Sequence, residues 1–140
     1  MSTHILAAIQ HTLGIDQLSE LDGYFIKGDV VIHKIQDHPL FDKLSNTSGN
    51  MAECRQLARE FATSLVKDGE WLYTAVILPI GSPMFQIILD RALRVVEDDI
   101  CEDIIRIYAH SERISEDQVQ PDGTVKKVSV FKHSHFNYLY

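Results

Sequence analysis

Residues 71–98, WLYTAVILPIGSPMFQIILDRALRVVED, constrain the fold of this chain more than any other stretch. An apolar run, 71–79, leads directly into the turn residues 80–83, Ile-Gly-Ser-Pro. A continuously apolar run favours a strand that is buried on both faces of a sheet. Ser82 is a preferred helix N-cap and Pro83 is a preferred first helical residue, so a helix should begin at the turn. The stretch therefore predicts a strand–turn–helix unit.

The segments on either side of this unit extend the pattern. Residues 97–103, EDDICED, indicate an acidic loop, and residues 103–109, DIIRIYA, indicate the next strand. Strand, helix and strand in this order form a βαβ unit, whose two strands are parallel. Upstream, residues 51–67 predict a helix with Asn50 as its N-cap and with Arg55, among others, on its polar face.

The N-terminal part of the chain is predicted to be a helical arm. Residues 3–13 place apolar side chains at helical spacing, and residues 16–21 indicate a second short helix. Residues 24–35 are rich in β-branched and aromatic side chains and predict a strand, broken at Gly28-Asp29 into a hairpin. The arm would span residues 1–23.

The remaining residues, 24–140, are predicted to form the body of one small α/β domain. Pro121-Asp122-Gly123 is a strong turn signal and predicts a C-terminal hairpin. The aromatic tail, 133–140, is expected to dock on the body or on a second subunit. We expect a short parallel or mixed sheet with flanking helices, and a homodimer that covers its apolar edges.

Composition argues against several classes of protein. A net charge of −7 is opposite to that of a general nucleic-acid binder. No apolar run approaches the roughly 20 residues that cross a bilayer, and the first residues lack the basic segment of a signal peptide. Cys54 and Cys101 form no CxxC motif and are typical of reduced thiols. We expect a cytoplasmic protein without membrane or nucleic-acid partners.

Three segments match, in order, the motifs of one enzyme family. Residues 38–60 contain HPL and RQLARE, residues 77–84 read ILPIGSPM, and residues 105–113 read IRIYAHSER. They are similar to the opening HPL and helical RELxxE-type patterns, the ILRAGLPM turn, and the YRDEET strand and hood of uracil phosphoribosyltransferases. The chain thus resembles the N-terminal half of this type I phosphoribosyltransferase family, which implies a truncated form of that fold.

Two departures from the family alter what the resemblance implies. Pro79 stands where the family has an arginine that helps to hold pyrophosphate, and proline offers neither a charge nor an N–H group. The DPMLATGG-like loop that grips the ribose phosphate is absent, as is the uracil-binding segment. We therefore expect a remodelled relative that has no phosphoribosyl transfer activity and needs no cofactor.

Gly81 and Ser82 are the first candidate ligand-binding residues. They lie at a helix N-terminus, where free backbone N–H groups and a hydroxyl can hold a phosphate or carboxylate. Open α/β sheets place their ligands at this edge. The alternative is that Ser82 only caps the helix, and the sequence contains no GxGxxG or GxxxxGK[ST] motif that would specify a nucleotide.

Tyr108, His110, Glu112 and Arg113 form the densest group of chemically active residues. His110 is a candidate general acid or base near neutral pH, with Tyr108 or Ser82 orienting a substrate. Arg113 would neutralise a carboxylate or phosphate, and Glu112 would contribute to ligand binding. Alternation places Tyr108 and His110 on one strand face. The alternative is a solvated strand end.

His133 and His135 form an HxH pair with both rings on one face of a strand, and they are the candidates for a metal site. Zinc would need a third protein ligand, which His38, His33 or an acidic residue could supply only if the fold brought it close. The alternative is two exposed histidines near the end of the chain, and we expect no bound metal.

Three functional hypotheses follow. The first is a binding or regulatory protein that holds a small anionic or nucleotide-like ligand at Gly81-Ser82, or docks on another protein. The second is a small enzyme with a repurposed pocket that uses His110 and Tyr108 for acid–base chemistry. The third is an immunity or anti-defence protein that acts by surface mimicry, which the size and acidity of the chain would fit, although no motif supports it. The first is favoured because no complete catalytic constellation can be named.

Overall fold

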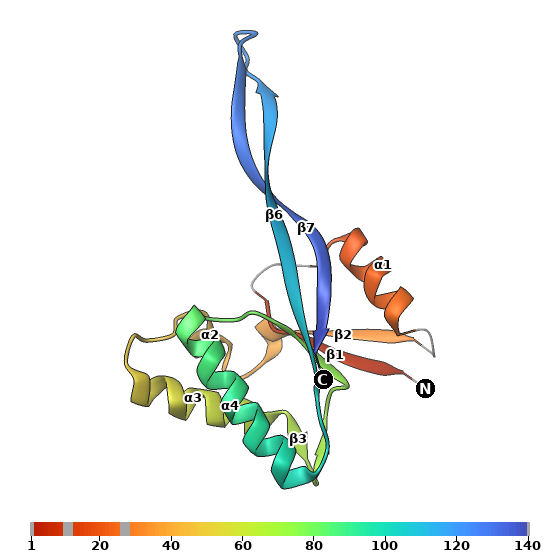
Figure 1. Cartoon of the computed structure of the whole chain (residues 1–140), viewed down its shortest axis with the longest axis vertical. Helices are drawn as coiled ribbons and strands as arrows, with labels where there is room; N and C mark the ends of the chain where they lie inside the picture. Colours follow the sequence, from red (N-terminus) through yellow and green to blue (C-terminus); the bar gives the residue numbers. More distant parts are fainter. Residues whose placement is uncertain (1, 10–12, 26–28, 140) are drawn as a thin grey trace.

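Strand β5, Ala75–Leu78, lies at the centre of the main sheet, and its four residues are at most 1% exposed. The buried strand predicted from the apolar run is confirmed only from Ala75 onward, since Trp71 belongs to the separate short strand β4, Glu70–Trp71. The computed structural model describes residues 2–9, 13–25 and 29–139, with the side chains of residues 111–114, 130–132 and 139 outside the description (Figure 1). Helix α4, Pro83–Ile100, follows the strand after one turn. The Ser82 hydroxyl accepts a hydrogen bond from the Phe85 N–H at 3.2 Å, which confirms the predicted cap.

Ten further elements occur in the described residues. They are β1 Thr3–Ala7, α1 Ile15–Tyr24, β2 Val30–Lys34, the 3₁₀ turn η1 Ile35–Asp37, α2 Phe41–Ser45, α3 Met51–Ser64, β3 Val66–Lys67, β4 Glu70–Trp71, β6 Ile105–Val119 and β7 Val125–Leu139, with the turn after β5 as the connection to α4. No helix in the described residues is long and apolar enough to span a bilayer.

The main sheet has five strands in the order β2-β1-β5-β6-β7. The first four strands are parallel, and β7 runs antiparallel to β6. Parallel strands that start at the centre and are added first on one side and then on the other are typical of doubly wound α/β proteins. The predicted fold class is therefore confirmed: a small mixed α/β domain with flanking helices and a C-terminal hairpin.

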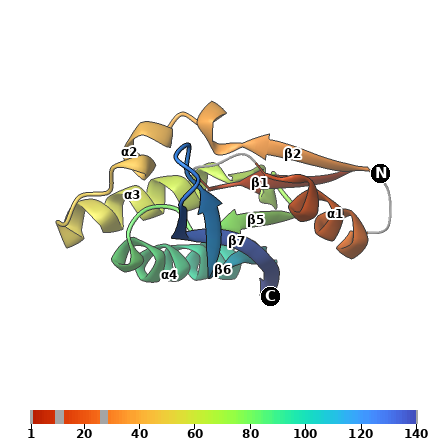
Figure 2. The ribbon, with the colours of Figure 1, turned by 90° about the horizontal axis from the view of Figure 1, so that it is seen from above.

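Helices cover both faces of this sheet. α3 and α4 lie side by side, with α1 apart from them (Figure 2). The larger core joins α3 and α4 to alternate strand residues such as Leu6, Val76 and Leu78. The smaller core joins Leu21 of α1 to the intervening strand residues, such as Ile77, whose side chains lie on the opposite face of the sheet. Because parallel strands in such a sheet are covered on both faces, they read as unbroken apolar runs.

The predicted helix over residues 3–13 is wrong. Thr3–Ala7 forms β1, which lies between β2 and β5 inside the sheet. All residues from Ile5 to Ile9 are at most 6% exposed. A short apolar run fits a fully buried strand as well as a helix, and pairing on both sides decided for the strand. The expected N-terminal helix is confined to α1, which is longer than the predicted residues 16–21.

Two other boundaries differ from the prediction. The acidic segment 97–103 is not a loop throughout, since α4 continues to Ile100 and ends at Cys101, whose φ is 58°. The predicted strand over residues 24–35 starts only at Val30, because Tyr24 still belongs to α1. The hairpin proposed at Gly28-Asp29 falls partly outside the described residues; the strand that follows Asp29, β2, pairs with β1 in parallel.

The C-terminal hairpin is longer than predicted. β6 and β7 have 15 residues each, and β6 pairs with β5 only as far as Tyr108. Beyond that residue the two strands form a ribbon that projects from the body (Figure 1). As far as Leu139, the aromatic tail belongs to β7, and it docks on α1, where the Tyr138 and Tyr24 ring centroids lie 3.8 Å apart in a stacked arrangement. This contact confirms the expected docking of the tail on the body.

Candidate functional site

The carboxyl ends of β1 and β5 mark the edge where an open α/β sheet of this order places its ligands. Along the chain, β2 is added outside β1 and β6 is added outside β5, so the sheet grows in opposite directions from these two neighbouring strands. The turn with Gly81 and Ser82 follows β5, and Tyr108 and His110 lie on the adjacent β6. The fold therefore brings the predicted ligand-binding turn and the predicted catalytic strand to the same edge of the sheet.

The polar atoms of Ser82 in the turn are bonded within the protein. The Ser82 N–H donates to the Thr47 hydroxyl at 3.1 Å, and the Ser82 hydroxyl caps Phe85. The Ser82 carbonyl accepts from the Gln86 N–H at 3.1 Å, in the first turn of the helix. Pro83 contributes no N–H group. An anion at Ser82 would therefore compete with the Thr47 hydroxyl for the Ser82 N–H group.

The turn is also tightly packed at Gly81. Its φ is +77°, and a Cβ atom there would lie 2.8 Å from Thr47 Cγ2 and 3.0 Å from Phe85 Cδ1. The Leu44 carbonyl oxygen would be 3.4 Å away. The glycine is thus required both by its left-handed backbone and by the approach of residues from the α2–α3 region. This packing accounts for a structural role of Gly81.

Tyr108 and His110 have different surroundings. Tyr108 packs against the larger core, and burial and the Asp90 carboxylate raise the pKa of its phenol, while Arg106 acts in the opposite direction. His110 is exposed, and its ring centroid lies 5.1 Å from that of His135. Within the described residues no hydrogen bond or ring contact joins Tyr108, His110 and Ser82. Glu112 and Arg113 lie on β6, but their side chains are outside the description.

The two tail histidines do not share one environment, contrary to the expectation of one strand face. A register shift between His110 and Ser111 pairs these residues with His135 and His133 and leaves Ser134 as an extra residue. His133 Nε2 lies 3.2 Å from Glu20 Oε1 on α1, whereas His135 lies beside His110. No group of three metal-ligating side chains occurs among the residues that the structure describes. The different surroundings of His133 and His135 follow from the bulge, because the extra residue reverses the alternation of side chains between the two faces of the strand.

Glu20 joins α1 to the outer edge of β7. Its Oε2 accepts from the Phe136 N–H at 2.7 Å and lies 3.3 Å from the Tyr138 hydroxyl. Burial and this carboxylate raise the pKa of Tyr138 to about 12. A backbone donor at a sheet edge is thereby paired, which protects β7 from further strand addition. Sequence analysis did not single out Glu20, because its partners lie more than a hundred residues away.

A buried ion pair also escaped sequence analysis. Arg106 of β6, 5% exposed, binds Glu97 of α4 through two contacts, Nη2–Oε1 at 2.7 Å and Nη1–Oε2 at 3.3 Å. Arg106 Nε lies 3.1 Å from Asp90 Oδ1. Asp90 and Glu97 both belong to α4 and lie on the same face of that helix. The spacing of seven residues between Asp90 and Glu97 was the available signal. The network attaches α4 to β6, so its role is to stabilise the fold.

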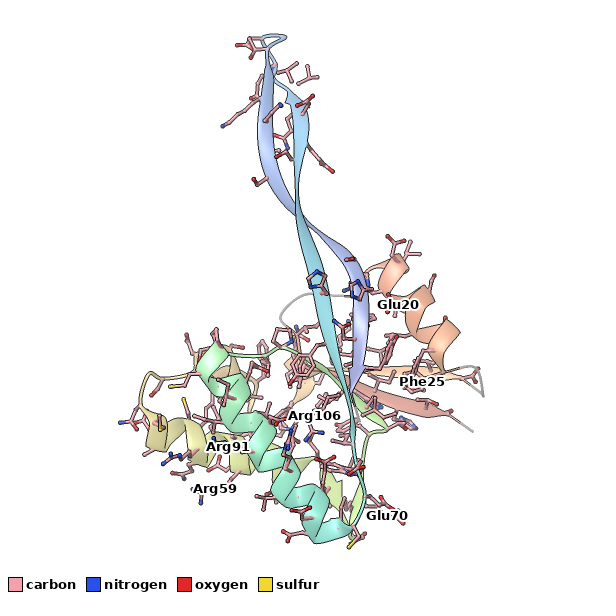
Figure 3. All side chains as sticks on the ribbon, in the orientation of Figure 1. Glu20, Phe25, Arg59, Glu70, Arg91 and Arg106 are labelled. Carbon is pink, nitrogen blue, oxygen red and sulfur yellow. The ribbon has the colours of Figure 1, made fainter. Side chains whose placement is uncertain are left out.

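The third feature that sequence analysis missed is a groove between α3 and α4, which we call the α3–α4 groove. Its volume is about 570 Å³. Apolar side chains and three arginines line it: Met51, Arg55, Arg59, Thr63, Met84, Ile87, Ile88, Arg91, Ala92, Val95, Val96 and Asp99. Figure 3 shows Arg59 and Arg91 on the same side of the helix pair.

Comparison with known proteins places the chain in one family. The model of the Uncharacterized protein MJ1673 family matches residues 3–137, and the chain belongs to this family. Neither curated proteins nor solved structures give a match. The matched range runs from the start of β1 to Asn137 of β7, so it includes nearly all of the sheet, the α3–α4 pair and the projecting ribbon.

Proposed function

We propose that this member of the MJ1673 family is a binding protein without catalytic activity, and that it acts on a protein partner. The observation that carries the proposal is a contrast between two surfaces. At the carboxyl edge of the sheet, the polar atoms of Ser82 are bonded within the protein. On the helical face, the three arginines of the α3–α4 groove have no acidic partner in the described residues.

The contrast separates the hypotheses. An enzyme needs an acid or base held within reach of a bound substrate. His110 is exposed, and no contact among the described residues links it to Tyr108 or Ser82. A small anionic ligand at Gly81-Ser82 would have to displace the Thr47 hydroxyl from the Ser82 N–H. A partner at the groove requires no such rearrangement.

In this proposal, the resemblance to uracil phosphoribosyltransferases accounts for the fold but not for an activity. Pro79, in place of the arginine of that family, argues against pyrophosphate binding at the turn. The immunity or anti-defence hypothesis involves the same mode of action, docking on another protein. Its proposed acidic surface differs from the groove, which is basic. The homodimer stays a prediction, to be measured by analytical ultracentrifugation.

Thermal-shift titration tests the proposal. The ligands are phosphate, pyrophosphate, nucleobases and nucleotides, and a ligand present at 100 times its Kd would stabilise the fold by about 2.7 kcal/mol. We expect no saturable shift for the wild-type protein. A shift that disappears in Ser82→Ala would instead establish an anion site at the turn. A ligand shift that disappears in His110→Ala would support the enzyme hypothesis.

A further inference from the structure

The α3–α4 groove runs along two neighbouring helices. On α3 its lining residues recur every four positions, from Met51 to Thr63, and on α4 the same spacing runs from Ile87 to Asp99. Twelve residues of helix span about 18 Å. The groove is therefore an elongated channel of about three helical turns, a length that suits a second helix or an extended peptide.

The floor of the groove is apolar and uncovered. Ile87 is 64% exposed, Val95 61% and Met51 48%. Of the described large apolar side chains with comparable exposure, these three line the groove, whereas the others lie elsewhere: Ile15, Leu72, Val119 and Val125. An apolar patch with a polar border is characteristic of a protein-interaction site.

Three arginines border this floor. Arg94 of α4 pairs with Asp90, and Arg106 pairs with Glu97. In contrast, Arg55, Arg59 and Arg91 make no ion pair with any residue that the structure describes. Asp99 is the one acidic side chain that lines the groove. A basic channel in a chain of net charge −7 is a local reversal of sign.

We propose that the α3–α4 groove binds an acidic amphipathic helix of a partner protein. This inference names the partner of the binding function proposed above and rests on it. An apolar stripe at positions i, i+3/i+4 and i+7 would pack on Ile87 and Val95, as in helix-in-groove recognition. Glutamates beside the stripe would pair with Arg55, Arg59 and Arg91. Arginine suits this role because its guanidinium binds carboxylates through two parallel hydrogen bonds.

Two other occupants, a second copy of the chain and nucleic acid, fit the groove less well. A second copy of the chain, docked about a two-fold axis, would bring the same three arginines toward their equivalents. Nucleic acid would pair with the arginines but would leave the exposed floor of Ile87 and Val95 without an apolar partner. An acidic helix with one apolar face satisfies both components of the groove.

Fluorescence polarisation with synthetic peptides tests the inference. The probe is a labelled amphipathic helix of about four turns, with leucines along one stripe and glutamates on both sides. In the control peptide, lysines replace the glutamates. We expect saturable binding of the acidic peptide, no binding of the lysine peptide, and weaker binding at about 0.5 M salt, where charges are screened.

Matched variants locate the binding surface. Arg59→Glu and Arg91→Glu should each weaken binding at least tenfold, about 1.4 kcal/mol. Ile87→Ser should also weaken it, through loss of apolar contact. Arg94→Glu, on the same helix but outside the groove lining, should change the affinity less than twofold. Circular dichroism melts check that each variant is folded, as expected for exposed positions.

Several outcomes would overturn the inference. These are equal binding of both peptides, binding that is unchanged in Arg59→Glu, and an Ile87-dependent dimer in sedimentation, which would identify a second copy as the occupant. Salt-sensitive binding of an RNA oligomer that is lost in Arg59→Glu would identify nucleic acid. Failure of the peptide to bind, without a small-ligand shift, refutes the inference alone; a Ser82-dependent shift refutes the proposed function itself.

Discussion

Arg106 and Glu97 form a two-contact ion pair in the interior, with Nη2–Oε1 at 2.7 Å and Nη1–Oε2 at 3.3 Å. The pair connects the middle of the sheet to the last turns of α4. Glu97 Oε2 also accepts from the Ile104 N–H at 3.0 Å, at the start of β6. One carboxylate therefore anchors both the arginine and the backbone of the strand that carries Tyr108 and His110.

Glu97→Ala should be among the most destabilising single substitutions. It leaves the Arg106 guanidinium buried beside Asp90 alone, and removing one partner of a buried ion pair costs about 3–5 kcal/mol. Urea denaturation measures the change. The double variant Glu97→Leu with Arg106→Met should lose less than Glu97→Ala, because no unpaired charge remains. A loss below about 1 kcal/mol for Glu97→Ala would contradict a buried, tightly coupled pair.

Gly81→Ala should destabilise the protein more than Gly69→Ala. Both glycines have a φ of +77°, so both substitutions carry backbone strain of about 1–2 kcal/mol. A Cβ atom at Gly81 would also approach Thr47 Cγ2 to 2.8 Å, whereas at Gly69 no atom of the described residues lies within 4 Å. Overpacking adds about 1–3 kcal/mol. Equal losses in the two urea transitions would mean that the turn relaxes freely.

Tyr138 should make the fold sensitive to alkaline pH. Burial and Glu20 raise its pKa from 10.0 to about 12, so the folded state holds the phenolic proton more tightly than the unfolded chain. The contribution is fully present below pH 10.0 and is lost as pH rises toward about 12. The urea midpoint of the wild type should fall more steeply over this range than that of Tyr138→Phe. Parallel curves would contradict the assignment, and Glu20→Gln should lower the phenol pKa in an absorbance titration.

His38 should make the fold sensitive to acid. Its Nδ1 accepts from the Leu40 N–H at 3.1 Å, and its Nε2 lies 2.9 Å from the Ser64 hydroxyl. The Ser64 hydroxyl in turn donates to the Phe61 carbonyl at 2.6 Å, so Nε2 carries the proton and the ring is neutral. Burial lowers the pKa of His38 below 6.5.

The direction of the pH effect on stability depends on whether the folded or the unfolded state is protonated first at His38 as pH falls. As pH falls below 6.5, the unfolded chain is protonated at His38 before the folded one, and stability decreases. The stabilising contribution is complete above 6.5. NMR titration of the ring should report the lowered pKa, and His38→Gln should show a smaller loss of stability in acid than the wild type. An ordinary ring pKa would contradict the proposed hydrogen-bond chain.

Local signals were enough to identify some elements from the sequence. Asn50 caps α3, with its side chain accepting from the Glu53 N–H, and Ser82 caps α4 before Pro83. These contacts span only a few residues, so the chain encodes them directly. The turn after β5 was identified for the same reason, although its capacity for a ligand depended on Thr47, which lies 35 residues away from Ser82.

The sequence by itself determined the α/β class, the β5–α4 unit, α3 and the hairpin turn, because caps, prolines and apolar periodicity act over short distances. Only the tertiary structure decided that residues 3–7 form a central strand, since pairing with β2 and β5 buries both of its faces. Only the packing of α3 on α4 brought Arg55, Arg59 and Arg91 together around one apolar floor. Each arginine alone reads as a solvated helix residue, and the groove exists because two separate polar faces meet.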